Sequence, residues 1–73
     1  MIVPLTQLGT GEVGRILSIK GGYGIKQKLA LRDVKEGNRV RMVSSSHGPV
    51  VIEVNRNMVA LGRGICTRIM IIK

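Results

Sequence analysis

Apolar and polar residues alternate with a period of two over several short stretches of the chain. Val40 and Met42, for example, alternate with Arg39 and Arg41. A period of two is typical of a strand that buries one face and exposes the other. The pattern predicts five strands, at residues 13–20, 39–43, 50–55, 58–61 and 69–72.

Two features modify this strand pattern. Ile16 and Leu17 are adjacent and both apolar, which predicts either a bulge in the first strand or a strand shared between two faces. Pro4 has no N–H to donate, so it limits any strand pairing of residues 1–8 to a sheet edge. Residues 6–8 are separately expected to form one tight helical turn. A second single turn is predicted at residues 65–68, just before the last strand.

Between the first two predicted strands the period changes to that of a helix. Residues 26–31 are good helix formers, and Ile25 and Leu29 share a face at a spacing of four. Asp33 tolerates the left-handed backbone that ends a helix, and Val34 would then contact Leu29. Gly37 turns the chain into the next strand. We therefore predict a helix at residues 25–31.

Together these elements predict a mainly β fold. It is a small, closed five-stranded barrel with one short α-helix after the first strand, packed across the barrel. The predicted core consists of Leu29, Val34, Val40, Ile52, Val54, Ile69 and Ile71.

Composition sets the size and the surroundings of this fold. With 73 residues, 44% hydrophobic, the chain fits one folded domain, residues 1–73. A lone cysteine excludes an internal disulfide, and the N-terminus has neither a charged leader nor an apolar run long enough for a membrane helix. These features predict a soluble, cytoplasmic protein.

The net charge of +8 changes the functional picture, because it exceeds what solubility requires. It predicts an anionic partner: a nucleic acid, an acidic protein face or an anionic lipid surface. Non-specific nucleic-acid binding by a small basic barrel is the main alternative. Against it, such barrels stack bases on aromatic side chains, and Tyr23 is the only aromatic residue.

Two possible chemical motifs are weak. Gly9, Gly11 and Gly14 match the letters G-x-G-x-x-G, but no buried strand precedes them and no helix follows, so we interpret them as loop and bulge positions. His47 and Cys66 are the only soft metal ligands, fewer than the three or four that a zinc site needs. We interpret Cys66 as a core residue and His47 as a solvated loop residue. An iron or zinc site through His47 stays open, either as a weak exposed site or as a site at a contact between two subunits. No catalytic group of residues is visible, which predicts that the chain is not an enzyme.

The order of apolar residues and glycines resembles that of the FeoA family, the ferrous iron transport protein A family. Its matches run from Leu5 to Ile71 and include Gly21-Gly22-Tyr23-Gly24, Lys28-Leu29, Gly48-Pro49-Val50 and Leu61-Gly62-Arg63-Gly64. Three positions depart from the family's usual pattern, with Arg32, Asp33 and Glu36 where an apolar residue, Gly and Pro are usual. The resemblance implies an SH3-like barrel with a helix after the first strand.

The resemblance also implies a function. It suggests a cytoplasmic accessory protein of ferrous iron uptake that acts on FeoB, a membrane transporter with a cytosolic GTPase domain, so that it meets the membrane only through this partner. Family members are commonly described as binding transition metal ions, and a homodimer is possible. The residues expected to contact the partner are Lys26, Lys28, Arg32, Lys35, Met58, Val59, Gly62, Arg63 and Gly64.

Overall fold

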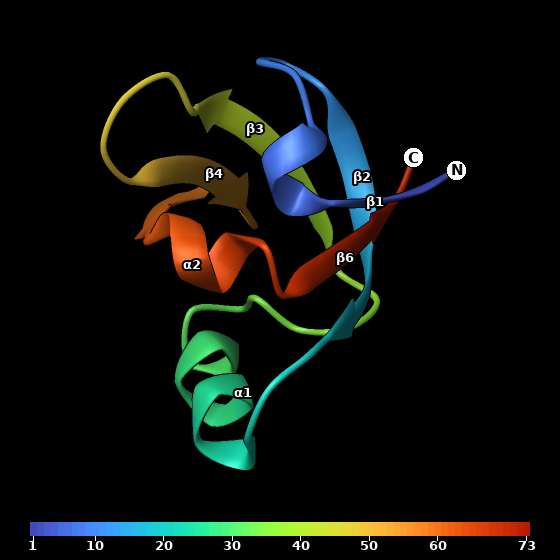
Figure 1. The fold of residues 1–73 in the computed structure, drawn as a ribbon, viewed down its shortest axis with the longest axis vertical. Helices are drawn as coiled ribbons and strands as arrows, with labels where there is room; N and C mark the ends of the chain where they lie inside the picture. The colour runs from blue at the N-terminus through green and yellow to red at the C-terminus, as the bar shows by residue number, and fades with distance from the viewer.

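The computed structural model describes residues 1–73 and contains one antiparallel sheet with a helix at one end (Figure 1). The elements in chain order are β1 (Ile2–Pro4), η1 (Leu5–Gln7), β2 (Val13–Ile19), α1 (Tyr23–Ala30), β3 (Arg39–Ser44), β4 (Val50–Val54), β5 (Asn57–Leu61), α2 (Arg63–Cys66) and β6 (Ile69–Ile72). The spatial order of the strands is β1-β6-β2-β3-β4-β5. The predicted mainly β class is confirmed.

The sheet has six strands, where the pattern predicted five. The additional strand is β1, which pairs with β6 over Ile2–Ile72, Val3–Ile71 and Pro4–Met70. It lies at the edge of the sheet, where the missing N–H of Pro4 breaks no ladder of hydrogen bonds. The predicted limitation of Pro4 to a sheet edge is confirmed, but the predicted set of five strands left out β1.

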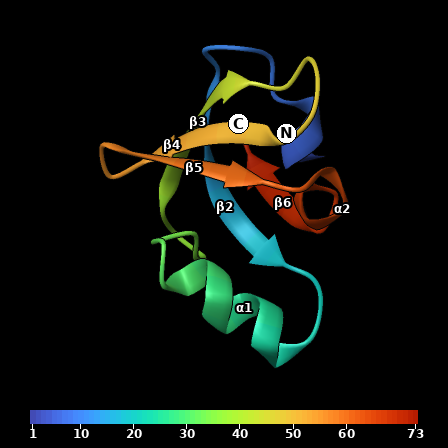
Figure 2. The ribbon, with the colours of Figure 1, turned by 90° about the vertical axis from the view of Figure 1, so that its left-hand side faces the viewer.

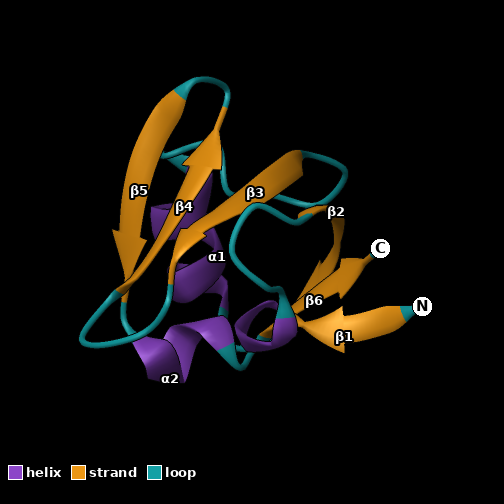
Figure 3. Cartoon of the chain, turned by 90° about the horizontal axis from the view of Figure 1, so that it is seen from above, coloured by secondary structure: helices purple, strands orange, loops and turns teal.

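The sheet curls strongly but does not close through hydrogen bonds, because no pairing joins β1 to β5 (Figure 3). The prediction of a closed barrel is wrong in this respect. Two short helical segments, η1 and α2, lie next to each other near the two edges. Each contributes one residue with no exposed surface, Leu5 from η1 and Cys66 from α2. Apolar side chains therefore fill the place of the missing strand pairing.

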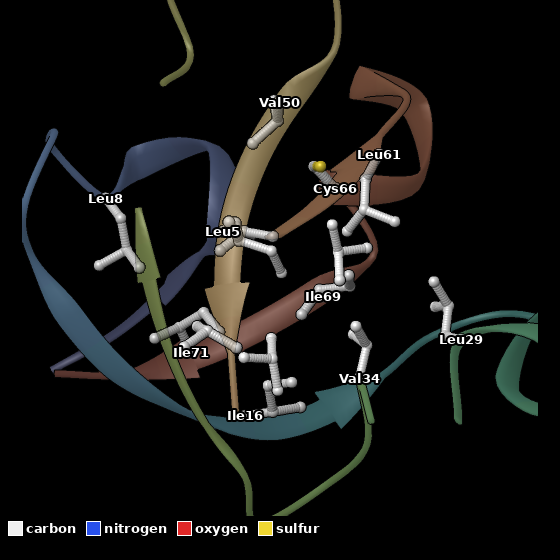
Figure 4. Close-up of a cluster of buried hydrophobic side chains, with 14 of the residues drawn as sticks. Leu5, Leu8, Ile16, Leu29, Val34, Val50, Leu61, Cys66, Ile69 and Ile71 are labelled. Atoms are coloured by element: carbon white, nitrogen blue, oxygen red, sulfur yellow. The ribbon is translucent and has the colours of Figure 1, made fainter. Parts of the chain in front are cut away.

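The core lies on the concave side of the sheet, as the side chains in Figure 4 show. All seven residues predicted for the core are buried in it. Alternation puts every second residue of β3 and β4 inside, which is why arginines and aliphatic residues can share one strand. The predicted bulge is also present, because the register of β2 against β6 shifts between Ile16 and Ser18.

Helix α1 lies at the end of the sheet and not across it, so the predicted packing of the helix was wrong (Figure 2). Leu29 is its only buried residue and lies at the margin of the core cluster, while Ile25 packs against the cluster from a half-buried position. A helix of eight residues with one buried side chain has too narrow an apolar stripe to cover a sheet.

The end of α1 follows the prediction. Asp33 has a φ of 64°, and its N–H donates to the carbonyl oxygen of Ala30 at 3.0 Å. The N–H of Val34 donates to the carbonyl oxygen of Leu29, also at 3.0 Å. These two bonds form the Schellman motif, which satisfies carbonyl groups that the last helical turn leaves free. The amide of Asn38 donates to the carbonyl oxygen of Asp33 at 2.8 Å and secures the turn.

Candidate functional site

A groove separates α1 from the strand edge opposite it. It is lined on one side by Lys28, Leu29, Leu31 and Arg32 of α1 and its C-terminal turn, and on the other by Ala60, Leu61, Gly62 and Ile65 of β5 and α2. We call it the α1–β5 groove. A second depression continues it past Leu31 and Arg32 toward Met58 and Ala60. The groove exists because α1 is attached at the end of the sheet and β5 has no strand on its outer side.

Most of the residues that line the groove are apolar, and part of this lining is exposed. Leu31 is 87% exposed, although it belongs to the segment predicted as helix. It cannot share the buried face of Leu29, because residues two apart in a helix point in nearly opposite directions. That spacing was the signal in the sequence that could have placed Leu31 in the site. Ala60 and Ile65 were also missed, and only the fold brings them opposite α1.

The four basic residues predicted to form one docking face lie on two sides of α1. Lys28 and Arg32 line the α1–β5 groove. Lys26 and Lys35 instead line a depression on the other side, together with Ile19 and Glu36. Lys26 pairs with Glu36 at 3.9 Å, whereas no carboxylate lies within ion-pair distance of Lys28 or Arg32. The structure therefore brings together only half of the predicted set.

The predicted apolar contacts are divided in the same way. Met58 is 62% exposed at the end of the groove, whereas Val59 is 4% exposed and belongs to the core. The expected partner contact through Val59 was wrong, because Val59 shares the inward face of β5 with Leu61.

Residues 62–64, which were expected to contact the partner, do not form a free loop. Gly62 is the N-cap of α2, and Arg63 and Gly64 form its first turn. The guanidinium of Arg63 donates to the carbonyl oxygen of Ser45 and ties α2 to the loop before β4. Of the three residues, the groove itself includes Gly62.

The two soft metal ligands have different surroundings. His47 is exposed in the loop between β3 and β4, and Cys66 is fully buried in α2. Burial raises the pKa of the Cys66 thiol to about 11, so the thiol is protonated at neutral pH. No three residues among His, Cys, Asp and Glu come together in a way that could hold a metal ion. The residues of one chain therefore do not fit a chelated metal, and a site shared between two chains through His47 stays a prediction.

The glycine-rich segment at residues 9–14 has a structural role in the fold. The carboxylate of Glu12 accepts a hydrogen bond from the N–H of Gly9 at 2.6 Å, which holds the pKa of Glu12 below its usual value with further help from Lys73. Gly14 is buried inside β2, where a Cβ atom would lie 2.2 Å from Cγ2 of Ile71. A side chain is excluded there by the neighbouring strand β6, and no phosphate cradle is formed.

The fold and the groove together define a structural class. The chain is a small β domain with a short appended helix and an exposed, partly apolar groove beside it. Its architecture is SH3-like, as the resemblance implied.

Comparison with known proteins narrows this class to a family. The FeoA domain family matches residues 3–73, and the chain belongs to this family. A protein of Methanocaldococcus jannaschii named as an Fe(2+) transport protein A is 29% identical over 68 residues, which are 93% of this chain and 83% of that protein. The family implies a role in ferrous iron transport.

Solved structures share the fold over nearly the whole chain. A crystal structure of an iron uptake regulatory protein, FeoA, has a TM-score of 0.89 at 33% identity, over 99% of this chain and 96% of that one. The IdeR protein of T. acidophilum has a TM-score of 0.87 at 24% identity, where the match covers 96% of this chain and 33% of that longer one. The second likeness shows that the same fold also occurs as part of larger proteins. No helix of this chain is long and apolar enough to cross a membrane.

Proposed function

We propose that this chain is a cytosolic accessory protein of ferrous iron uptake and that it docks on a FeoB-type membrane transporter through the α1–β5 groove. The observation that supports the docking site is the combination of exposed apolar side chains with two unpaired cations, Lys28 and Arg32. Family membership supports the process in which the contact takes place. In this proposal the chain regulates the transporter and catalyses no reaction itself.

The groove offers the two contributions that a regulated protein contact uses. Burial of Leu31 and its apolar neighbours stabilises the complex by about 25 cal/mol for each Å² removed from water. Lys28 and Arg32 steer an acidic partner to the groove and fix its orientation, and this attraction weakens with salt because the Debye length is about 10 Å at 0.1 M. The complementary partner is a segment that carries apolar side chains next to Asp or Glu.

Ferrous iron is the transported cargo in this proposal. The chain does not need to hold the ion, and it offers no chelating set within one copy. If two copies share an iron or zinc site through His47, calorimetry should show tight binding of the metal ion. This binding should be lost in His47→Ala. Weak binding that is indifferent to this substitution would argue against the shared site.

Non-specific nucleic-acid binding remains the competing function for the positive charge. It predicts weak, strongly salt-dependent binding without sequence preference. Tight binding of one preferred sequence near physiological salt would favour it over the transporter contact.

The test measures transporter-dependent iron uptake in cells that lack this protein. These cells are then supplied with the wild type, with Lys28→Glu/Arg32→Glu, or with the matched control Lys26→Glu/Lys35→Glu. Both variants change the net charge by the same amount, but only the first changes the groove. We expect the groove variant to fail and the control to restore uptake.

Two outcomes would contradict the proposal at different levels. Normal uptake in cells without the protein would remove the accessory role altogether. Full rescue by a folded Lys28→Glu/Arg32→Glu variant would keep the role but exclude this groove as the docking site. Leu31→Ser, an exposed position whose change should not disturb folding, tests the apolar part of the contact in the same assay.

A further inference from the structure

The outer face of the sheet carries side chains that lie outside the core and, apart from Met58 at the end of the α1–β5 groove, outside the groove as well. The strand registers align these side chains in two rows across neighbouring strands. The first row runs through Ile2, Ile72, Arg15 and Arg39, and the second runs through Val13, Arg41, Glu53 and Met58. All of them are exposed except Glu53, which is half-buried.

Positive charge on this face is only partly compensated. Arg41 pairs with Glu53, but Arg15 and Arg39 lie directly opposite each other on β2 and β3 with no carboxylate within ion-pair distance. Like charges opposite each other destabilise a sheet. The guanidinium of Arg15 donates to the carbonyl oxygen of Gly37 at 2.6 Å, which leaves its charge in place. The fold thus keeps an unfavourable pair that a bound anion would relieve.

Arg56 adds a third free cation from an unusual backbone position. It follows Asn55 in the turn between β4 and β5. The φ angle is 50° at Asn55 and 69° at Arg56. Hairpin turns with two positive φ values favour Gly at the second position, and a bulky residue there is strained. Arg56 and Arg39 line the same depression, together with Arg41 and Asn55. Strain of this kind is retained more often at functional positions than elsewhere.

Aliphatic side chains lie in the same rows as Arg15, Arg39 and Arg41. Ile2 is 57% exposed, and Ile72 and Val13 are each 41% exposed, all in register with the arginines. We call this surface, defined by Arg15, Arg39, Arg41 and Arg56 and these aliphatic neighbours, the arginine face. It combines guanidinium groups, which bind phosphate through two parallel hydrogen bonds, with residues that can enter an apolar layer.

We propose that the arginine face binds directly to the surface of an anionic phospholipid bilayer. Each Arg near such a surface is attracted by the negative lipid headgroups, and exposed aliphatic residues insert at the boundary with the acyl chains. A single-stranded nucleic acid fits less well, because the only aromatic side chain, Tyr23, belongs to α1 and lies outside both rows. This contact is separate from the proposed transporter contact, because the two surfaces share none of their cations.

The test is co-sedimentation of the purified full chain with vesicles. We expect binding to phosphatidylcholine vesicles rich in phosphatidylglycerol and none to vesicles of phosphatidylcholine alone. Arg15→Gln/Arg39→Gln should weaken binding roughly fivefold for each arginine removed. The matched control Lys28→Gln/Arg32→Gln, which removes the same charge from the groove, should bind nearly as well as the wild type.

A second variant separates loss of binding from loss of folding. Arg56→Gly removes a cation and also relieves the strained backbone, so it should raise the melting temperature and still weaken vesicle binding. Equal losses in the two double variants would show that net charge alone acts, and would overturn the proposed face. Absence of binding to phosphatidylglycerol, or tighter arginine-dependent binding of duplex DNA or RNA than of vesicles, would overturn the lipid proposal as well.

Discussion

The sheet and helix α1 differ in how much each contributes to the buried core. In the sheet, every strand contributes to the contacts around one core of 16 buried residues, completed by η1 and α2. Helix α1 contributes one residue to that core and has few backbone neighbours outside its own turns. The difference shows that the fold does not depend on most of the surface of α1, which leaves that surface available for recognition.

The attachment of α1 depends on a few contacts at its ends. Leu29 and the half-buried Ile25 hold the helix body, and the Schellman motif around Asp33 fixes its C-terminal end. The N-cap, Gly22, makes no side-chain hydrogen bond. A short helix with a weak N-terminal cap is marginal without packing, so α1 should open more readily than the sheet.

The largest expected effect comes from a change in the sheet. Ile52→Ala removes a side chain with no exposed surface from the centre of β4. We expect a loss of about 2–5 kcal/mol in the free energy of unfolding, enough to unfold much of a domain of this size. Urea denaturation followed by circular dichroism measures it. A stability close to that of the wild type would mean that the sheet is not the main source of stability.

Leu29→Ala tests the helix side of the comparison. We expect a loss near 2–3 kcal/mol, since Leu→Ala changes in a core cost about 2–5 kcal/mol and this site lies at the margin. Hydrogen exchange should show loss of protection first in α1, with the strands less affected. Unchanged melting would show that Leu29 does not anchor the helix, and equal loss across the molecule would show that α1 and the sheet form one cooperative unit.

The stability of the protein at alkaline pH tests whether the thiol of Cys66 in α2 lies in an apolar interior. The pKa of the Cys66 thiol is raised from 9.0 to about 11, so above pH 9 the unfolded chain loses this proton while the folded chain keeps it. Stability should therefore fall as the pH rises from 9 to 11, by about 2 kcal/mol from this group. Cys66→Ala should make the pH dependence flatter in this window. The same slope in both proteins would place the thiol in a more polar environment.

The smallest effect concerns the helix stop. Asp33→Gly replaces a residue at positive φ with the one that adopts this backbone freely, so we expect a gain of about 0.5–1 kcal/mol. Asp33→Ala should have the opposite sign, because a Cβ without a polar group is strained there. Thermal melting of both variants compares them. If both change stability in the same direction, the side chain of Asp33 and not its backbone determines its role.

The sequence predicted those parts of the molecule that depend on local patterns. Asp33 and Val34 were placed in the helix stop because the motif requires only neighbouring residues. The inward residues of β3 and β4 followed from alternation. The prediction that α1 packs across the barrel was wrong, because the sequence of the helix does not indicate which part of the sheet its one buried face contacts. Strand β1 was missed because it is short and pairs with the opposite end of the chain.

The candidate site was harder to predict for a related reason. Lys26 and Lys28 are close in the sequence, yet they lie on different sides of α1. The groove depends on how α1 meets β5, and these elements are separated by two strands in the chain. Val59 shows the opposite case, since alternation with Leu61 already indicated an inward position.

One consequence of the β1–β6 pairing concerns how this polypeptide could be joined to others. The terminal ammonium of Met1 donates to the carbonyl oxygen of Lys73 at 3.0 Å, and the N–H of Lys73 donates to the carbonyl oxygen of Met1 at 2.9 Å. The path of the backbone therefore returns to its starting point. A short linker between the two ends, with a new opening in an exposed turn such as residues 55–56, should give a circularly permuted protein with the same sheet. For the same reason, a loop of a host protein could accept the whole unit as an insertion with hardly any separation between the two points of attachment.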